Sequence, residues 1–450
     1  MGLNTTEDAV SASALTDLVR SFGSVFGFKA LSTAASFLTL ALVGRRLGPA
    51  GLGDLSIART LMLVAAGLFG PALDTAAVRF ASQDPRRFSA FFAGVFRVKA
   101  GLVLGFAAVG MSLAVPIRDR LFHSEAAVPP SSFLVTAALA GAGGFMLFEY
   151  VRVYYQARRR FAVYGGLELA HAVARLVGVG CIAAAGWAST GTFFGLYAAV
   201  PCVLAIVGLM AIPRECIVGQ DRASGVLTEM FRFVRWVAVA CALTSAANGL
   251  DMLLIGWFRI PDVPKGDYSA ARALAQVGDL AVLSLFSVLL PKASGCVDMR
   301  AARLYLKRYM GMAAGVAAAL SAMLMPALPL ARVVLRVAFG QAFGQAGGCL
   351  AVLLFGMLLA LAGAPASAMV YARGRPRTIA LLEGLKLALI YGVALYAAPR
   401  YGIMGIAWTL AAAKGTISLL TCVAALSAVN RGCEDRAEQE SWVQHDRHHT

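Results

Sequence analysis

The chain has 450 residues, of which 59% are hydrophobic and only 14% are charged, and its formal net charge is +16. Typical soluble domains carry about 25% charged residues, whereas apolar stretches of bilayer-spanning length recur along this chain. The composition excludes an ordinary soluble enzyme and predicts an all-α integral membrane protein.

Twelve membrane-spanning helices are predicted, taking about twenty apolar residues for each crossing. In chain order they lie at 22–44, 53–78, 90–116, 131–151, 161–186, 191–212, 234–257, 268–290, 305–327, 346–371, 378–397 and 402–428. The chain then consists of an N-terminal segment 1–21, an N-lobe 22–212, a linker 213–233, a C-lobe 234–428 and a C-terminal tail 429–450. Twelve crossings place both termini on the same side.

The basic residues of the connections indicate which side that is, because cytoplasmic loops carry the excess of arginine and lysine. The connections on the side of the termini hold 21 arginines and lysines and the others hold nine, the former being 79–99, 152–160, 213–235, 292–308 and 373–377. We therefore expect a multi-pass membrane protein with both termini in the cytoplasm. The basic residues are too dispersed for a nucleic-acid interface, although they can also hold anionic lipid headgroups at the inner surface.

An internal duplication relates the two lobes. Gly53–Leu61 reads GDLSIARTL and Gly266–Leu274 reads GDYSAARAL, so that six of nine positions agree at an offset of 213. At an offset of 215, a second repeat places Ala157, Arg158, Arg160 and Glu168 on Ala372, Arg373, Arg375 and Glu383. Two six-helix bundles that run in the same direction should be related by an axis along the membrane normal and enclose a central cavity.

Arg59 and Arg272 occupy equivalent places in this duplication, so both are expected to face the cavity at the same depth. Guanidinium groups bind phosphate oxygens in pairs and stay charged when partly desolvated. The two arginines are therefore the best candidates to hold a diphosphate. The alternative is that each is neutralised within its own half, for example by Asp54 or Asp267.

Other ionisable residues within the crossings are costly to bury and are candidates for function. Lys29 and Lys414 can extend the basic lining of the cavity. Asp74, Asp251 and Asp279 can bind a coupling proton or sodium ion, or neutralise the cavity arginines; the sequence leaves both roles open.

The fifth and eleventh helices carry a further repeated set of charges. Glu168, His171 and Arg175 share one helix face, and Glu383 and Lys386 recur at matching places. An acid followed three residues later by a base is most simply an intrahelical ion pair, and a proton or substrate role is the alternative.

The remaining patterns do not indicate a catalytic or metal site. The eight cysteines are scattered without a CxxC pair, and the chain has no Walker loop, GxSxG or HExxH signature. We therefore expect no enzyme activity, metal or cofactor. The glycines of Ala140–Gly144 (AGAGG), and Gly101 and Gly105, are expected to permit close helix packing.

Several segments resemble the Wzx-type polysaccharide flippases of the multidrug/oligosaccharidyl-lipid/polysaccharide exporter superfamily. They are RRLGPAGLGDLSIARTL (Arg45–Leu61), NGLDMLLIG (Asn248–Gly256), LRVAFGQAFGQAGGCL (Leu335–Leu350) and YARGRPR (Tyr371–Arg377). The ARTL and ARAL segments are also similar to those of the lipid II flippase, in which the matching arginines line a cationic cavity for a lipid diphosphate. The resemblance implies two bundles that open alternately to each face, with Arg59, Arg272 and, more loosely, Lys29 at the diphosphate.

The resemblance implies a flippase for a polyprenyl-diphosphate-linked oligosaccharide, such as an O-antigen or exopolysaccharide repeat unit. Twelve expected crossings, against fourteen in the lipid II flippase, favour this branch. The expected partners are the lipid-linked glycan, membrane lipids and polysaccharide polymerase or assembly proteins. The alternatives are a cation-coupled multidrug exporter, a membrane glycosyltransferase, ligase or polymerase acting on lipid-linked sugars, and a scaffold of an assembly complex.

Overall fold

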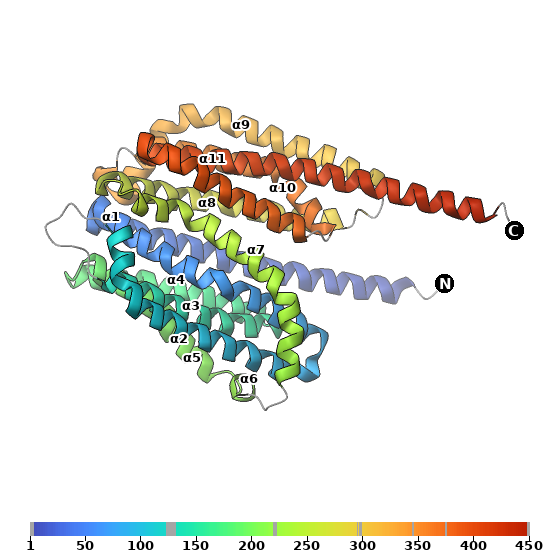
Figure 1. Ribbon diagram of the computed structural model, residues 1–450, viewed down its shortest axis with the longest axis horizontal. Helices are drawn as coiled ribbons and strands as arrows, with labels where there is room; N and C mark the ends of the chain where they lie inside the picture. Colours follow the sequence, from blue (N-terminus) through green and yellow to red (C-terminus); the bar gives the residue numbers. More distant parts are fainter. Residues whose placement is uncertain are drawn as a thin grey trace. The chain divides into compact units, whose positions relative to one another are not determined.

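The computed structural model describes residues 4–122, 132–218, 223–294, 296, 299–343, 346–373 and 376–447, which are helical apart from short turns (Figure 1). The N-terminal helices are α1 (Asn4–Gln83), η1 (Pro85–Arg87), α2 (Phe88–Leu121), α3 (Phe133–Ala157), α4 (Phe161–Ala184), α5 (Thr190–Met210) and α6 (Glu215–Val218). The C-terminal ones are α7 (Ala223–Trp257), α8 (Asp262–Ser294), α9 (Met299–Phe339), η2 (Gln341–Phe343), α10 (Ala346–Ala372) and α11 (Pro376–Arg447).

The two longest helices each contain a break at a glycine. Gly48 in α1 has φ 69° and Gly402 in α11 has φ 55°, and both depart from helical geometry. A left-handed backbone ends a helix, and glycine adopts it without the steric cost of a Cβ. Each helix therefore supplies two crossings, as the sequence predicts for the turns near 45–52 and 398–401.

The helices account for the expected crossings. Eight helical segments are long and apolar enough to span a bilayer, and the bent pair within α9, which turns by 73°, adds a ninth. Two of the eight, at 27–81 and 380–429, are the segments broken at Gly48 and Gly402. The 33-residue α8, which carries several charges, completes a series of twelve long helices in the described chain. The predicted all-α membrane fold is confirmed.

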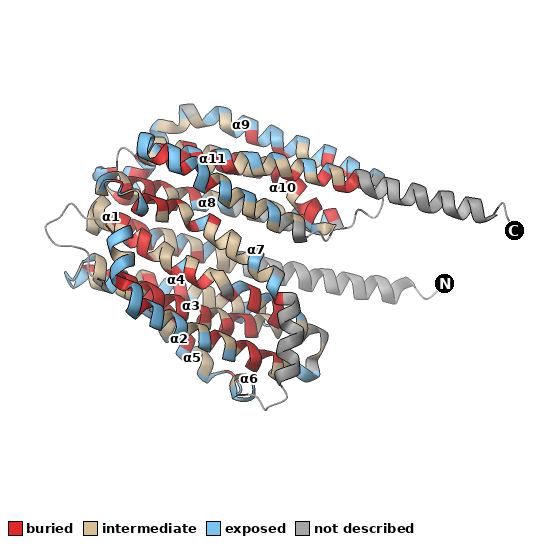
Figure 2. Ribbon diagram, in the orientation of Figure 1, coloured by how far each residue is buried: buried red, intermediate tan, exposed pale blue. Residues whose placement is uncertain are grey.

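The chain divides into two compact units, residues 1–245 and 246–450, and the boundary along the sequence falls within α7. In the first unit α3 packs against α1, α2, α4 and α5, and in the second α10 packs against α8, α9 and α11. Both central helices are the fourth of their six and are mostly buried, as Figure 2 shows for α3. The same helix therefore forms the centre of each unit, as expected of a duplication.

The turns between helices repeat as well. Gly48 joins the first and second helices, and Arg259, with φ 53°, lies between the seventh and eighth. Gly186, with φ 78°, lies between the fifth and sixth, and Gly402 between the eleventh and twelfth. Equivalent helix pairs thus turn through a left-handed residue in both units.

Large apolar side chains lie exposed along α2, α5 and α9 (Figure 2), including Met111, which is 78% exposed, and Met210, which is 84% exposed. Exposed apolar surface of this extent is unfavourable in water and is expected where a protein contacts lipid. The chain is a multi-pass membrane protein.

Glycines permit close approach at the centre of both units. A Cβ on Gly141 would lie 3.0 Å from the Cα of Ala198, and one on Gly144 would lie 3.1 Å from the Cα of Cys202. The predicted packing role of Ala140–Gly144 is confirmed. It is wrong for Gly101 and Gly105, which are exposed and where a Cβ would meet no atom of the described residues within 4 Å.

Gly356 of α10 is the clearest test of this packing. We expect Gly356→Ala to lower the free energy of unfolding by about 1–3 kcal/mol, because its Cβ would lie 2.8 Å from the Cα of Ala411 and would force α10 and α11 apart. Gly392→Ala is the matched control, since a Cβ there meets open space. Thermal unfolding in detergent measures both variants, and equal midpoints would contradict the prediction.

Candidate functional site

A cavity of about 540 Å³ lies in the first unit between α1 and α3. Its walls are mostly apolar, but four acidic, amide or hydroxyl side chains reach it, those of Asp74, Thr75, Glu149 and Gln156. Arg79 lies in the same lining. Acidic groups within a membrane protein need partners, and two buried cations supply them.

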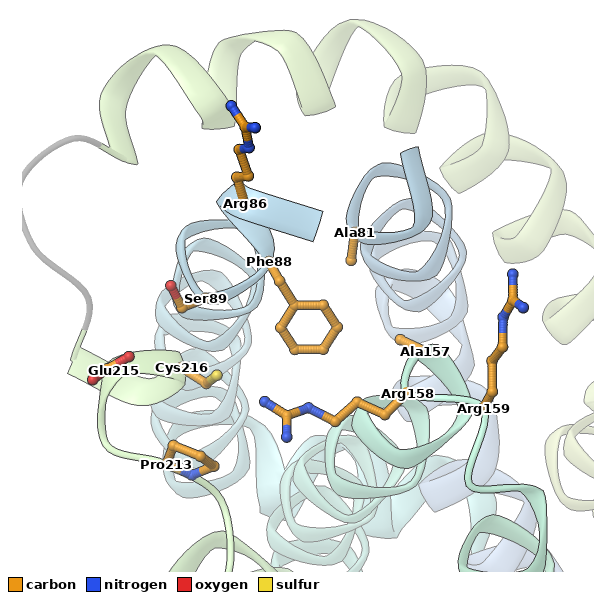
Figure 3. Close-up of a pocket in the computed structure, with 10 residues that line it drawn as sticks. All are labelled: Ala81, Arg86, Phe88, Ser89, Ala157, Arg158, Arg159, Pro213, Glu215 and Cys216. Atoms are coloured by element: carbon orange, nitrogen blue, oxygen red, sulfur yellow. The ribbon is translucent and has the colours of Figure 1, made fainter. Parts of the chain in front are cut away.

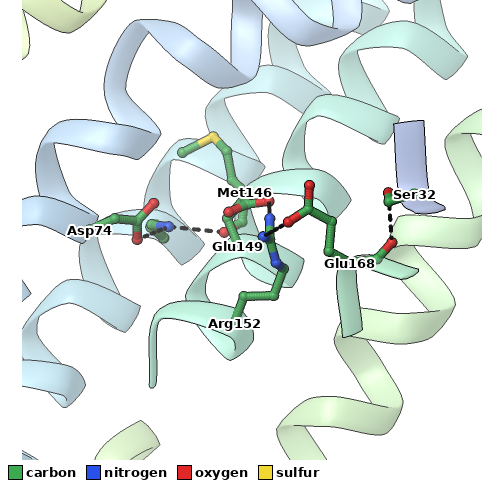
Figure 4. A network of polar contacts seen from close by, with 7 residues as sticks. Ser32, Asp74, Met146, Glu149, Arg152 and Glu168 are labelled. Carbon is green, nitrogen blue, oxygen red and sulfur yellow. Dashed lines mark hydrogen bonds and ion pairs between the residues drawn. The ribbon is translucent and has the colours of Figure 1, made fainter. Parts of the chain in front are cut away.

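Lys99 of α2 is the first of these cations, and its partners Asp74 and Met146 are labelled in Figure 4. Its Nζ lies 2.6 Å from Oδ1 of Asp74 and donates a 3.0 Å hydrogen bond to the carbonyl of Met146. The lysine is fully buried and the Asp74 side chain is 13% exposed. This ion pair joins α1, α2 and α3 within one unit.

Arg152 of α3 is the second. Its guanidinium lies 2.5 Å from Glu149, one turn earlier on the same helix, and 2.6 Å from Glu168 of α4 (Figure 4). The ring of Tyr164 lies 4.6 Å from the guanidinium carbon. Because the Arg152 guanidinium contacts two carboxylates at once, its orientation is fixed.

The structure corrects the sequence interpretation at four of these positions. Lys99 and Arg152 do not belong to the connections 79–99 and 152–160, since both lie inside helices and are buried. Asp74 pairs with Lys99 and not with a cavity arginine, and Glu168 pairs with Arg152 and not within its own helix. Removing the two cations from the count of 21 leaves 19 basic residues against nine, so the charge asymmetry persists.

His171 and Arg175 lie on the same helix as Glu168 and are both buried. The His171 ring packs against Phe148, with ring centroids 5.0 Å apart. Arg175 donates a 3.1 Å hydrogen bond to Oγ of Ser36 in α1 and lies 5.1 Å from the Tyr197 ring. These contacts fix α4 against α1 and α5.

In the second unit, Arg272 of α8 is held by α7. One guanidinium nitrogen lies 2.8 Å from Oδ1 of Asp251, and another donates to the carbonyl of Asn248. The hydroxyl of Tyr268 donates a 2.8 Å hydrogen bond to Oδ2 of Asp251. The side chains of Arg272 and Asp251 are 16% and 1% exposed, so the carboxylate is enclosed while the arginine reaches a surface.

Asp251 thus has the neutralising role that the sequence left open. Asp267, the counter-ion that the sequence suggested for Arg272, is not its partner. Positions five apart on a helix lie about 140° apart around its axis, because one turn takes 3.6 residues. Asp267 therefore cannot share the face of Arg272, whereas Asp251 approaches it from the preceding helix.

The remaining predicted residues are distributed over both units. Lys386 forms the predicted intrahelical pair with Glu383 at 2.5 Å, which confirms that interpretation for α11. Lys414 lies 3.4 Å from Asp279 of α8, and both side chains are substantially exposed. Lys29 and Arg59 are both half-buried in α1, before and after its break at Gly48.

Taken together, the charges form an enclosed network in the first unit and an oriented arginine in the second. The ion pair of Glu149 and Arg152 has a sequence signal, because the two residues lie three positions apart near the end of an apolar segment. Lys99 offered a weaker one, because no acidic residue lies three or four positions from it on its helix. An arginine that is fixed by a buried carboxylate and still reaches a surface can bind an anion with little loss of side-chain freedom.

Comparisons with known proteins agree with this architecture. The family model described as polysaccharide biosynthesis protein matches residues 18–295. A search of curated protein sequences finds no match.

Several solved structures share the fold. An inward-facing multidrug resistance MATE family transporter of the MOP superfamily is 14% identical, with a TM-score of 0.70 over 89% of this chain and 95% of that one. The lipid II flippase MurJ in an inward closed conformation is 12% identical, with a TM-score of 0.68 over 89% and 87% of the two chains. A MOP superfamily transporter from Pyrococcus furiosus is 14% identical, with a TM-score of 0.64 over 91% and 95%. At these identities the likeness establishes the fold alone.

Proposed function

The chain belongs to the polysaccharide biosynthesis protein family, and we propose that within it the protein is a flippase. Its substrate is a polyprenyl-diphosphate-linked oligosaccharide, such as an O-antigen or exopolysaccharide repeat unit. The protein moves this substrate from the cytoplasmic to the outer leaflet of a bacterial inner membrane by alternating access. Both termini lie in the cytoplasm, in keeping with the excess of basic residues in the connections on their side. No covalent bond changes during transport.

The observation that carries the proposal is the arginine that occurs once in each half of a duplicated chain. Arg59 and Arg272 follow the same phrase at an offset of 213, and the fold neighbours include a lipid II flippase. Two guanidinium groups complement one diphosphate in charge and in geometry. We therefore assign the two arginines to the diphosphate.

Arg272 has the properties that this role requires. Its two contacts, with Asp251 and the Asn248 carbonyl, fix the guanidinium without enclosing it. A preorganised cation binds an anion with a smaller entropic cost than a flexible one. Lys29 and Lys414 extend the basic lining, the sugar occupies the cavity, and the lipid chain stays in the bilayer.

The acids within the membrane then act chiefly as counter-ions. Asp74, Glu168, Asp251 and Glu383 each lie within 2.8 Å of a basic group, and Asp279 lies 3.4 Å from one. This supports neutralisation of buried cations over a coupling-ion site for these five residues. Transport is then driven by substrate mass action or by the membrane potential.

Neutral substitution of the arginines tests the proposal. Arg272→Gln alone would leave Asp251 buried without a cation, so the informative variant combines Arg59→Gln with Asp251→Asn and Arg272→Gln. We expect this variant to bind a polyprenyl-diphosphate lipid at least about 100-fold more weakly than the wild type, because charge-assisted hydrogen bonds contribute about 1.5–3 kcal/mol each. Binding is measured on purified protein, and flipping in liposomes that contain the lipid-linked sugar.

The matched control neutralises the intrahelical pair with Glu383→Gln and Lys386→Gln, and it should retain binding. A triple variant that is folded and binds as tightly as the wild type would refute the diphosphate role. Formation of a new glycosidic product by the purified protein would instead establish an enzyme.

A further inference from the structure

A second cavity, of about 550 Å³, lies at one end of the first unit (Figure 3). It is formed where α1 ends and α2 begins, together with the turn after α3 and the short α6. Ala81 on its wall lies 22 residues after Arg59, or about 33 Å along a helix. The cavity is therefore remote from the proposed diphosphate arginine.

The lining of this cavity is basic. Arg86, Arg158 and Arg159 contribute three positive charges and Glu215 contributes one negative charge. Burial raises the pKa of the Cys216 thiol, which keeps that group neutral at pH 7. The side chains of the lining thus carry a net charge of +2. Asp84, two residues before Arg86, accepts a 3.1 Å hydrogen bond from the backbone N–H of Arg86.

Aromatic rings hold one of the arginines in place. The guanidinium carbon of Arg158 lies 5.2 Å from the centroid of the Phe88 ring and 4.8 Å from that of Tyr154. In Figure 3 the Arg158 side chain extends between Phe88 and Pro213. Stacking of this kind orders an arginine without consuming its charge, so the group is prepared for an anion.

The start of α2 adds to the positive potential. This 34-residue helix begins at Phe88, its N-cap Arg87 makes no side-chain capping bond, and Ser89 of its first turn lines the cavity. Helix N-termini favour negative charge, phosphate above all. The cavity therefore combines the guanidinium of Arg158 with a helix N-terminus, while the side chains of Arg86 and Arg159 extend outward from its edges (Figure 3).

An exposed apolar stripe lies on α5, the helix that precedes Pro213 of the cavity lining. Val203, Ile206, Val207 and Met210 of α5 are all exposed and recur at helical spacing on one face. Pro213, three residues after Met210, lies on the rim of the cavity. A ligand with a phosphate group and a hydrocarbon chain matches both features at once.

We propose that this cavity binds the phosphate group of an anionic phospholipid, whose acyl chain lies along the α5 stripe. Basic pockets at the ends of membrane helices are suited to such headgroups. The site is separate from transport: it ties the first unit to a lipid of the surrounding leaflet, whether or not the protein is a flippase.

Native mass spectrometry of the full chain in detergent tests the site, with phosphatidylglycerol and phosphatidylcholine added in equal amounts. The wild type should retain phosphatidylglycerol preferentially. The double variant Arg158→Gln with Arg159→Gln removes two positive charges and should reduce that retention about tenfold, which corresponds to about 1.4 kcal/mol of binding free energy. Arg160→Gln is the control, because Arg160 is exposed, adjacent in sequence and outside the lining. Equal retention of the two lipids, or an equal loss in the control, would overturn the proposal.

Two further measurements separate the lipid from a free anion. Met210→Ser should weaken retention of phosphatidylglycerol, because it removes part of the acyl surface without changing the charge. Millimolar inorganic phosphate should leave the bound lipid in place; its release would assign the cavity to a free phosphate and overturn the lipid assignment. Arg86→Gln, at an exposed rim position, provides a second charge variant should the double variant not fold, and unchanged retention in it would also count against the site.

Discussion

Replacing Lys99 with methionine is expected to lower the free energy of unfolding by about 3–5 kcal/mol, which is the usual cost of breaking a buried ion pair. The methionine has a similar length but cannot neutralise Asp74, whose carboxylate lies 2.6 Å from Nζ of the lysine and is only 13% exposed. The carbonyl of Met146 also loses the hydrogen bond that the lysine donates. Thermal unfolding of the purified protein in detergent, followed by tryptophan fluorescence, measures the loss.

The double variant Asp74→Asn with Lys99→Met is the decisive control. Removing both charges removes the unpaired carboxylate, and replacing a whole buried pair is often nearly neutral. We therefore expect the double variant to recover most of the stability that Lys99→Met loses. A single variant as stable as the wild type, or a double variant as unstable as the single one, would contradict the account of this network.

The architecture was predictable because its signals extend over many residues. Twelve apolar segments determined the helix count, and the repeated phrases around Arg59 and Arg272 identified the duplication. The helix break at Gly48 falls in the predicted connection 45–52, and the break at Gly402 lies one residue after the predicted connection 398–401. The structure adds that equivalent turns adopt the same left-handed backbone, a property that Arg259 could not reveal in sequence, because arginine has no preference for positive φ.

The charge network was less predictable, because an ion pair depends on which helix faces which. Lys99 and Arg152 lie near the ends of apolar segments, where a cation is normally assigned to a loop. Their burial follows from the acids that pair with them: Asp74 and Glu168 on facing helices, and Glu149 one turn earlier on the helix of Arg152. Glu383 and Lys386 were predicted correctly, because an intrahelical pair needs no knowledge of tertiary structure.

Replacing Asp251 with asparagine is expected to change stability and anion binding in opposite directions. The substitution leaves the partly buried Arg272 without its carboxylate, so the free energy of unfolding should fall by about 3–5 kcal/mol. At the same time the site gains one net positive charge. Where the protein remains folded, the Asn248 carbonyl still orients the Arg272 guanidinium, and the affinity for a polyprenyl-diphosphate lipid should therefore rise.

Tyr268→Phe separates the charge from the geometry. It removes the 2.8 Å hydrogen bond to Oδ2 of Asp251 but keeps the ion pair, so it should cost about 1.5 kcal/mol of stability and leave anion affinity unchanged. If the role of Arg272 is purely structural, Asp251→Asn should lower stability without any gain in affinity for the diphosphate lipid. Thermal unfolding together with lipid binding, measured on the same preparations, distinguishes the two. A folded Asp251→Asn protein with unchanged or weaker diphosphate binding would remove Arg272 from the substrate site and leave it as the counterpart of a buried carboxylate.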